Sequence, residues 1–75
     1  MIVYRTTVTR GKEVVAVFHS DDLTTASNNA YAVAESGDAV TVTTVVEAVD
    51  GEWEDTYNNN VVMRYIFATP HKFDT

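Results

Sequence analysis

One segment with helical periodicity, flanked on both sides by alternating patterns, most constrains the fold of this chain. Apolar residues recur at the three- and four-residue spacing of a single helix face at Leu23, Ala26, Ala30, Val33 and Ala34. Asp22 before this stripe is a predicted N-cap, and Gly37 is suited to the position just past the C-terminus of the helix, so we expect a helix over residues 23–36. Because its Thr and Asn residues form helices poorly, packing against a sheet must hold this helix in place.

Five segments around the helix have the patterns of β-strands. Alternating or β-branched residues occupy 2–9, 13–19, 39–49, 52–57 and 61–68. Glycines in Arg10-Gly11-Lys12 and in Asp50-Gly51 predict two hairpin turns. The order β-β-α-β-β-β favours an α+β fold in which one helix packs on one face of a mostly antiparallel sheet.

Details of the strands add two expectations. Tyr4, Met63, Tyr65 and Phe67 alternate within their strands and are predicted core residues. The doubled residues of 43–46 predict room for a bulge in the third strand.

The size of the chain limits it to one domain, residues 1–75, with a mass of 8.3 kDa. Burial and conformational entropy nearly cancel at this size, and the chain has no cysteine for a disulfide. A homodimer or a firm partner contact is therefore favoured. Since no apolar run reaches the roughly 20 residues of a membrane helix and the N-terminus lacks a signal-peptide pattern, we expect a soluble, cytoplasmic protein.

No segment has the residue pattern of an enzyme or a cofactor site. His19-Ser20-Asp21-Asp22 holds the residue types of a catalytic triad, but neighbours on an extended segment point in opposite directions. His19 and His71 lack the spacing of metal ligands, and the glycines sit at turns. Glu52 and Glu54 share a strand face on which carboxylates are more often solubilising than catalytic. We therefore predict a non-enzymatic protein without a metal or a cofactor.

The net charge of −6 is distributed unevenly. Residues 1–19 carry 3 − 1 = +2 and residues 61–75 carry 2 − 1 = +1, whereas residues 20–60 carry nine carboxylates and no Lys or Arg. This charge repels nucleic acids and anionic membranes, so neither is expected as a direct partner.

The carboxylates are densest in the second predicted hairpin. Its candidate partner-binding residues are Glu47, Asp50, Glu52, Trp53, Glu54, Asp55 and Tyr57. The like charges repel one another until a basic surface approaches, and Trp and Tyr are frequent interface anchors. Either this hairpin binds a basic protein, or Trp53 and Tyr57 are core residues and the acids solubilise an edge. The direction of the Trp53 ring decides between the two.

The layout of the chain resembles that of small bacteriophage host-interaction proteins. The resemblance lies in Val17-Phe18-His19-Ser20-Asp21-Asp22-Leu23-Thr24-Thr25-Ala26, followed by a Val/Thr strand and Asp50-Gly51-Glu52-Trp53. The family includes some anti-CRISPR proteins and inhibitors of bacterial RNA polymerase. The resemblance implies a phage-encoded inhibitor that acts in the host cytoplasm. Such an inhibitor is an acidic DNA mimic that occupies the basic nucleic-acid groove of a host complex.

Two other classes of protein fit the same sequence. One is a small structural or oligomerisation protein, such as a virion or scaffold component, whose strand edges and Phe73 make the contacts. The other is an antitoxin-like module that masks a basic toxin.

Overall fold

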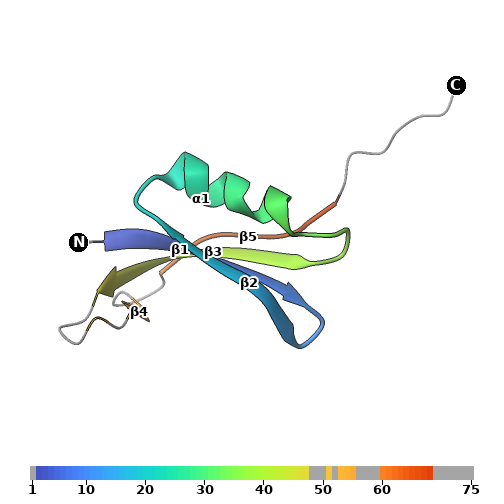
Figure 1. Cartoon of the computed structure of the whole chain (residues 1–75), viewed down its shortest axis with the longest axis horizontal. Coiled ribbons are helices and arrows are strands. Elements are labelled where there is room, and N and C mark those ends of the chain that lie inside the picture. The colour runs from blue at the N-terminus through green and yellow to red at the C-terminus, as the bar shows by residue number, and fades with distance from the viewer. Residues whose placement is uncertain (1, 48–50, 52, 56–59, 69–75) are drawn as a thin grey trace, which may run out of the picture.

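The fold is α+β, with an antiparallel sheet and one α-helix, as predicted (Figure 1). A computed structural model describes residues 2–47, 51, 53–55 and 60–68. The elements in chain order are β1 (Ile2–Arg10), β2 (Glu13–Ser20), α1 (Leu23–Asn29), the 3-10 turn η1 (Ala30–Ala32), β3 (Ala39–Glu47), β4 (Trp53–Asp55) and β5 (Val61–Ile66). Neither described helix is long and apolar enough to span a bilayer.

The central strand of the sheet is β3. β1 pairs along one of its edges, with β2 outside β1, while β4 and β5 share the other edge. β4 pairs with residues 45–47 and β5 with residues 39–43. Between them the Thr44 N–H donates to the Asn60 carbonyl at 2.9 Å, and Asn60 Nδ2 donates to the Thr44 carbonyl at 3.2 Å. Asn60 therefore joins the ends of the two short ladders.

The helix begins where predicted but ends earlier. The Asp22 carboxylate accepts hydrogen bonds of 2.8 Å from the Thr25 N–H and hydroxyl, which confirms the N-cap. The predicted end at residue 36 is wrong, because α1 ends at Asn29 and continues only as η1. The Asn28-Asn29 pair favours this early end, since Asn side chains compete for backbone hydrogen bonds.

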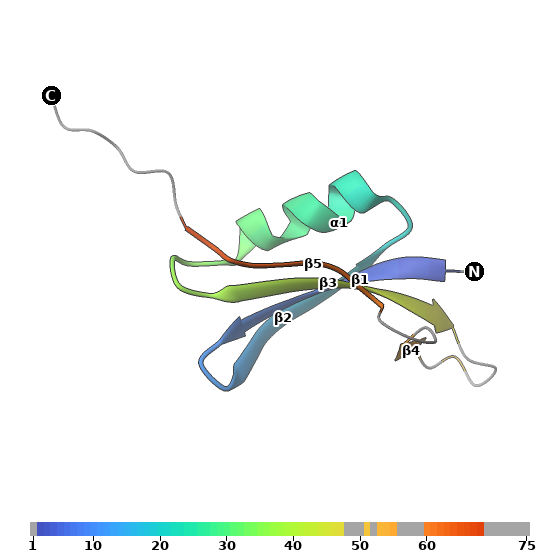
Figure 2. The same cartoon turned by 180° about the vertical axis from the view of Figure 1, so that it is seen from behind.

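The main core lies between the sheet and the helical layer, which covers one face of the sheet in both views (Figures 1 and 2). It consists of Val8, Ala30, Val40 and Phe67, with Val15, Val33, Ala34 and Tyr65 packed around it. Phe67 is thus a core residue as predicted, and Tyr65 is half-buried against the core. Tyr4 and Met63 are half-buried.

The other face of the sheet also buries apolar side chains at one end. Val3 and Val45 are register partners, and both are buried. Their side chains point away from α1. Side chains alternate between the two faces along a strand, and Val3 and Val45 are each an odd number of residues from a valine on the helix side, Val8 in β1 and Val42 in β3. β3 therefore buries side chains on both faces of the sheet.

The two irregularities of the sheet lie in the strands next to β1 and β3. β2 has an extra residue, Val15, opposite the step from Val8 to Thr9. β5 has an extra residue, Val62, opposite the step from Val42 to Thr43. The register shift is thus close to the bulge predicted from residues 43–46, but its extra residue belongs to the partner strand.

Candidate functional site

The acidic hairpin predicted from the sequence is present as the β3–β4 pair. Val45 pairs with Asp55, Val46 with Glu54, and Glu47 with Trp53. Gly51, in the connection, has φ +85°, the left-handed backbone that favours glycine at a turn. The structure therefore brings four of the seven candidate residues into one short antiparallel ladder. Asp50, Glu52 and Tyr57 lie outside the described residues.

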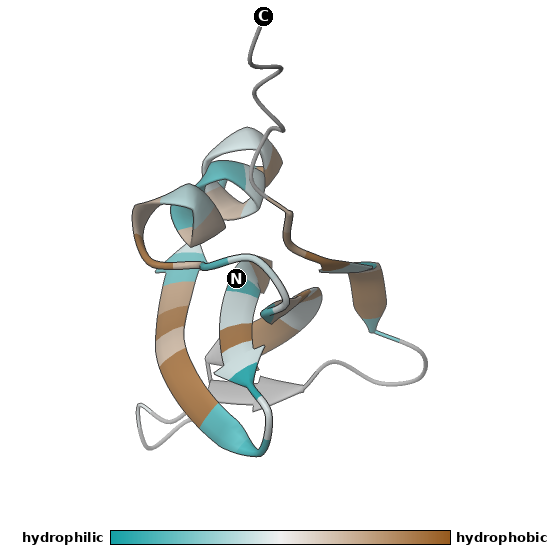
Figure 3. Ribbon diagram, turned by 90° about the vertical axis from the view of Figure 1, so that its right-hand side faces the viewer, coloured by the Kyte–Doolittle hydropathy of each residue, from teal (hydrophilic) through white to brown (hydrophobic). Residues whose placement is uncertain are grey.

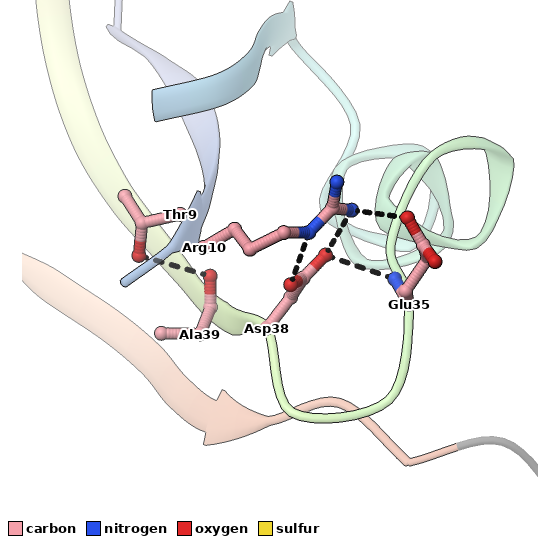
Figure 4. Close-up of polar contacts among 5 residues, drawn as sticks. All are labelled: Thr9, Arg10, Glu35, Asp38 and Ala39. Atoms are coloured by element: carbon pink, nitrogen blue, oxygen red, sulfur yellow. Dashed lines mark hydrogen bonds and ion pairs between the residues drawn. The ribbon is translucent and has the colours of Figure 1, made fainter. Parts of the chain in front are cut away.

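A second group of charges joins the end of β1 to the loop before β3 (Figure 4). Arg10 Nε donates to Asp38 Oδ1 at 2.9 Å, and Arg10 Nη2 donates to Asp38 Oδ2 at 2.8 Å. The same Nη2 lies 2.8 Å from Glu35 Oε2, and the Glu35 N–H donates to Asp38 Oδ2 at 2.9 Å. Asp38 is 2% exposed, so this bidentate pair closes the loop onto the sheet.

These contacts shift both ionisation equilibria in the direction that keeps the pair charged. The Arg10 guanidinium, followed by the Glu35 N–H, lowers the pKa of Asp38 below its ordinary value. The hydrogen bond with Asp38 raises the pKa of Arg10. Sequence reasoning missed this group because 28 residues separate Arg10 from Asp38. Two of the nine carboxylates in residues 20–60 are therefore paired with a cation of the chain itself.

Asp22 is a third carboxylate with a structural role. The hydrogen bond from the Thr25 N–H, followed by that from the Thr25 hydroxyl, lowers the pKa of Asp22. Apart from the exposed Asp21, the nine carboxylates of residues 20–60 thus form two sets. Asp22, Glu35 and Asp38 stabilise the helix start and the loop before β3. Five others, Glu47, Asp50, Glu52, Glu54 and Asp55, belong to the hairpin sequence.

The residues that superficially resemble a triad form the entry to α1. The Ser20 hydroxyl accepts from the Asp22 N–H at 3.1 Å and lies 3.2 Å from the Asp22 carbonyl. His19 Nε2 accepts from Arg5 Nε at 3.2 Å. Burial, followed by the charge of Arg5, lowers the pKa of His19 and favours the neutral ring. These residues therefore form the turn that leads from β2 into α1.

The described residues include no group of three or more His, Asp or Glu side chains arranged to hold a metal ion. In comparisons with known proteins, no family model, curated protein or solved structure matches this chain. A proposal for its function therefore depends on its own charges and strand pairing.

Proposed function

We propose that this protein is a non-enzymatic protein-binding inhibitor that presents the β3–β4 hairpin to a basic, nucleic-acid-binding surface of a host complex. The observation that carries the proposal is the pairing of Glu47 with Trp53, and of the next positions with Glu54 and Asp55. This register brings acidic positions of two strands and an aromatic position to one edge of the sheet.

The dimensions of the ladder support a cooperative electrostatic site. Its two residue steps span about 7 Å, and its strands are about 4.8 Å apart. Both lengths are below the Debye length of about 8 Å at physiological ionic strength, so charges at these positions are only partly screened from one another. A partner rich in Arg and Lys relieves this repulsion, and electrostatic attraction also speeds its association.

The ion pairs of Arg10 with Glu35 and Asp38 also support the hairpin as the binding site. Arg10 forms its ion pairs with Asp38 and Glu35, which lie in the loop before β3. The positive charge at the end of β1 thus neutralises carboxylates of that loop, which lie outside the hairpin. Trp53 adds the residue type most enriched at energetically dominant contact positions.

A competition assay with charge-reversal variants tests the proposal. Purified nucleic-acid-binding complexes, including a CRISPR effector and a bacterial RNA polymerase, are loaded with labelled DNA and titrated with the full chain. We expect the wild-type chain to displace DNA from one of them. Glu52→Lys combined with Glu54→Lys should weaken displacement at least tenfold, which corresponds to about 1.4 kcal/mol.

The matched control is Glu13→Lys combined with Asp21→Lys. Both double variants change the net charge from −6 to −2, since each substitution adds two charges. Glu13 and Asp21 are exposed and lie outside the hairpin. The control should displace DNA nearly as well as the wild type. Equal losses in the two variants would mean that net charge alone acts, and the hairpin would not be the binding site.

A small self-assembling structural protein is the second candidate. Within the described residues, β2 pairs only with β1, and β4 and β5 pair only with β3, so both borders of the sheet remain available to another strand. Open growth through both edges predicts large assemblies in sizing chromatography. If the protein is an inhibitor, we expect sizing chromatography to show a species of one or two chains.

A further inference from the structure

The outer edge of β2 has no strand beside it in the part of the chain that the structure describes. β2 lies at the border of the sheet, where it leads up to α1 (Figure 3). Natural proteins commonly protect such an edge with Lys, Pro, a bulge or a covering element. β2 contains neither Lys nor Pro, residues 14–20 include no Asp, Glu, Lys or Arg, and its bulge at Val15 leaves residues 16–20 regular. Its edge is therefore chemically suited to receive another strand.

Apolar side chains accompany this open edge. Val14 is 57% exposed and Val17 is 46% exposed. They pair with Thr9 and Thr7, respectively, on the face of the sheet opposite α1. Adding a strand beside the regular half of β2 would cover part of Val17 as well as satisfy backbone hydrogen bonds.

The interior of the chain favours association. The largest fully buried apolar side chains are Val8, Val40, Val42 and Val45. Among the described residues, Phe67 is the only buried apolar side chain larger than Val, and the chain has no disulfide. A 75-residue chain with so small an interior gains stability by burying more surface against a partner.

Charge selects the edge at which two copies can meet. Two copies that each carry −6 repel, so they can meet most easily where neither presents an ionised group. The β5 edge carries the exposed cation Arg64, which would approach its own counterpart. The β2 edge carries only Glu13, at its far end from Ser20. We infer that β2 pairs antiparallel with β2 of a second copy, across a two-fold axis perpendicular to the sheet.

The bulge at Val15 fixes the most regular register. Residues 16–20 pair without interruption with residues 4–8 of β1, so this half of β2 is the regular template. An antiparallel ladder that uses all of residues 16–20 in both copies is centred on Phe18. It places Phe18 opposite its counterpart, Val17 opposite His19 of the second copy, and Ala16 opposite Ser20. None of these pairs opposes like charges, and the central pair is aromatic.

Sedimentation equilibrium of the full chain is the first test. We expect a wild-type mass of twice 8.3 kDa that falls on dilution. Val17→Glu should raise the dimer dissociation constant at least tenfold, because it buries a charge beside the ladder. Val62→Glu is the matched control: Val62 is 42% exposed on β5, and the variant has the same net charge. It should dimerise like the wild type.

Disulfide trapping tests the register separately, since the natural chain has no cysteine. At the axis, Phe18→Cys places two Cα atoms about 4.5–5.5 Å apart, within the disulfide range. In Val17→Cys the two positions are diagonal and about 7–8 Å apart, beyond that range. Phe18→Cys should therefore cross-link under mild oxidation far more than Val17→Cys or Val62→Cys.

Three results would overturn the inference. They are a wild-type chain that stays monomeric at millimolar concentration, a Val17→Glu variant that dimerises as well as Val62→Glu, and equal cross-linking of the Phe18 and Val62 cysteines. A monomeric wild type would leave the β2 edge to a strand of another protein. The hairpin variants leave β2 intact, so this inference and the proposed function can fail independently.

Discussion

The hydrogen bond from the Thr6 hydroxyl to the Ala26 carbonyl joins β1 to α1. It is 2.7 Å long, and both residues are fully buried. Ala26 lies in the middle of α1, which has only seven residues. The bond from Thr6 therefore ties the short helix directly to the sheet. Thr6→Val is expected to break this bond while keeping the shape of the side chain.

The expected cost of Thr6→Val is about 1–3 kcal/mol, because a buried carbonyl loses its partner. For a chain of this size each kcal/mol corresponds to roughly 4–8 °C in Tm. Urea unfolding followed by circular dichroism measures the free energy. Wild type and variant must be compared at one protein concentration, since dimerisation would contribute to apparent stability.

Thr9→Val is the matched control for this prediction. Its hydroxyl lies 3.5 Å from the Ala39 carbonyl, at the limit of a hydrogen bond, and the residue is only half-buried. We expect a change within about 0.5 kcal/mol. If Thr6→Val destabilises no more than Thr9→Val, apolar packing alone holds α1 on the sheet and the reasoning is refuted.

Three further substitutions test the core, a turn and the ion pair. Phe67→Ala should cost about 3–5 kcal/mol in urea unfolding, because it empties a core position beside the Tyr31 ring, whose centroid is 5.3 Å away. Gly37→Ala should cost about 1–2 kcal/mol in the same assay, from backbone strain alone, since φ is +97° and no atom would lie within 4 Å of the new Cβ. Asp38→Asn should destabilise the chain at pH 7. Because Arg10 lowers the pKa of Asp38, the wild-type advantage should shrink as the pH falls below about 4, in thermal melts across pH.

The features of the fold that the sequence predicts are those set by local chemistry. Asp22 is an N-cap in the sequence and in the structure, because its carboxylate needs only the backbone three residues ahead. Gly11 and Gly51 both adopt positive φ between paired strands. The alternation of β-branched residues predicts the strands for the same reason, since it depends on a two-residue repeat.

The features that sequence reasoning missed depend on distant contacts. The bond between Thr6 and Ala26 spans 20 residues and that between Arg10 and Asp38 spans 28. Nothing near Asp38 in the sequence marks it as buried, and a count of charges treats it like any other acid. By the alternation of side chains along β3, Val45 lies on the face of the sheet opposite the helix, yet it is buried together with its register partner Val3.

The candidate site was predictable as a hairpin and only partly as a charged surface. The Asp50-Gly51 signal and the flanking strand patterns predict the hairpin. The structure adds its register, in which Glu47 pairs with Trp53. The total of nine carboxylates overstated the acidity available to a partner, because Glu35 and Asp38 are bound to Arg10. The directions of the hairpin side chains stay a prediction.

Together, the two proposals predict a bivalent inhibitor. The sheet order β2-β1-β3-β4 places the hairpin strand β4 at the opposite edge from β2. Pairing through β2 then separates the two β4 strands by seven inter-strand steps of about 4.8 Å, or about 34 Å along the sheet. A partner with two basic sites at that separation should bind the wild-type chain more tightly than the monomeric Val17→Glu variant. Avidity should make the difference in affinity about 100-fold or more. A partner with one basic site should bind both chains equally. A titration calorimetry experiment in which Val17→Glu loses the same affinity for both kinds of partner would exclude bivalent binding, even if the hairpin itself is the contact.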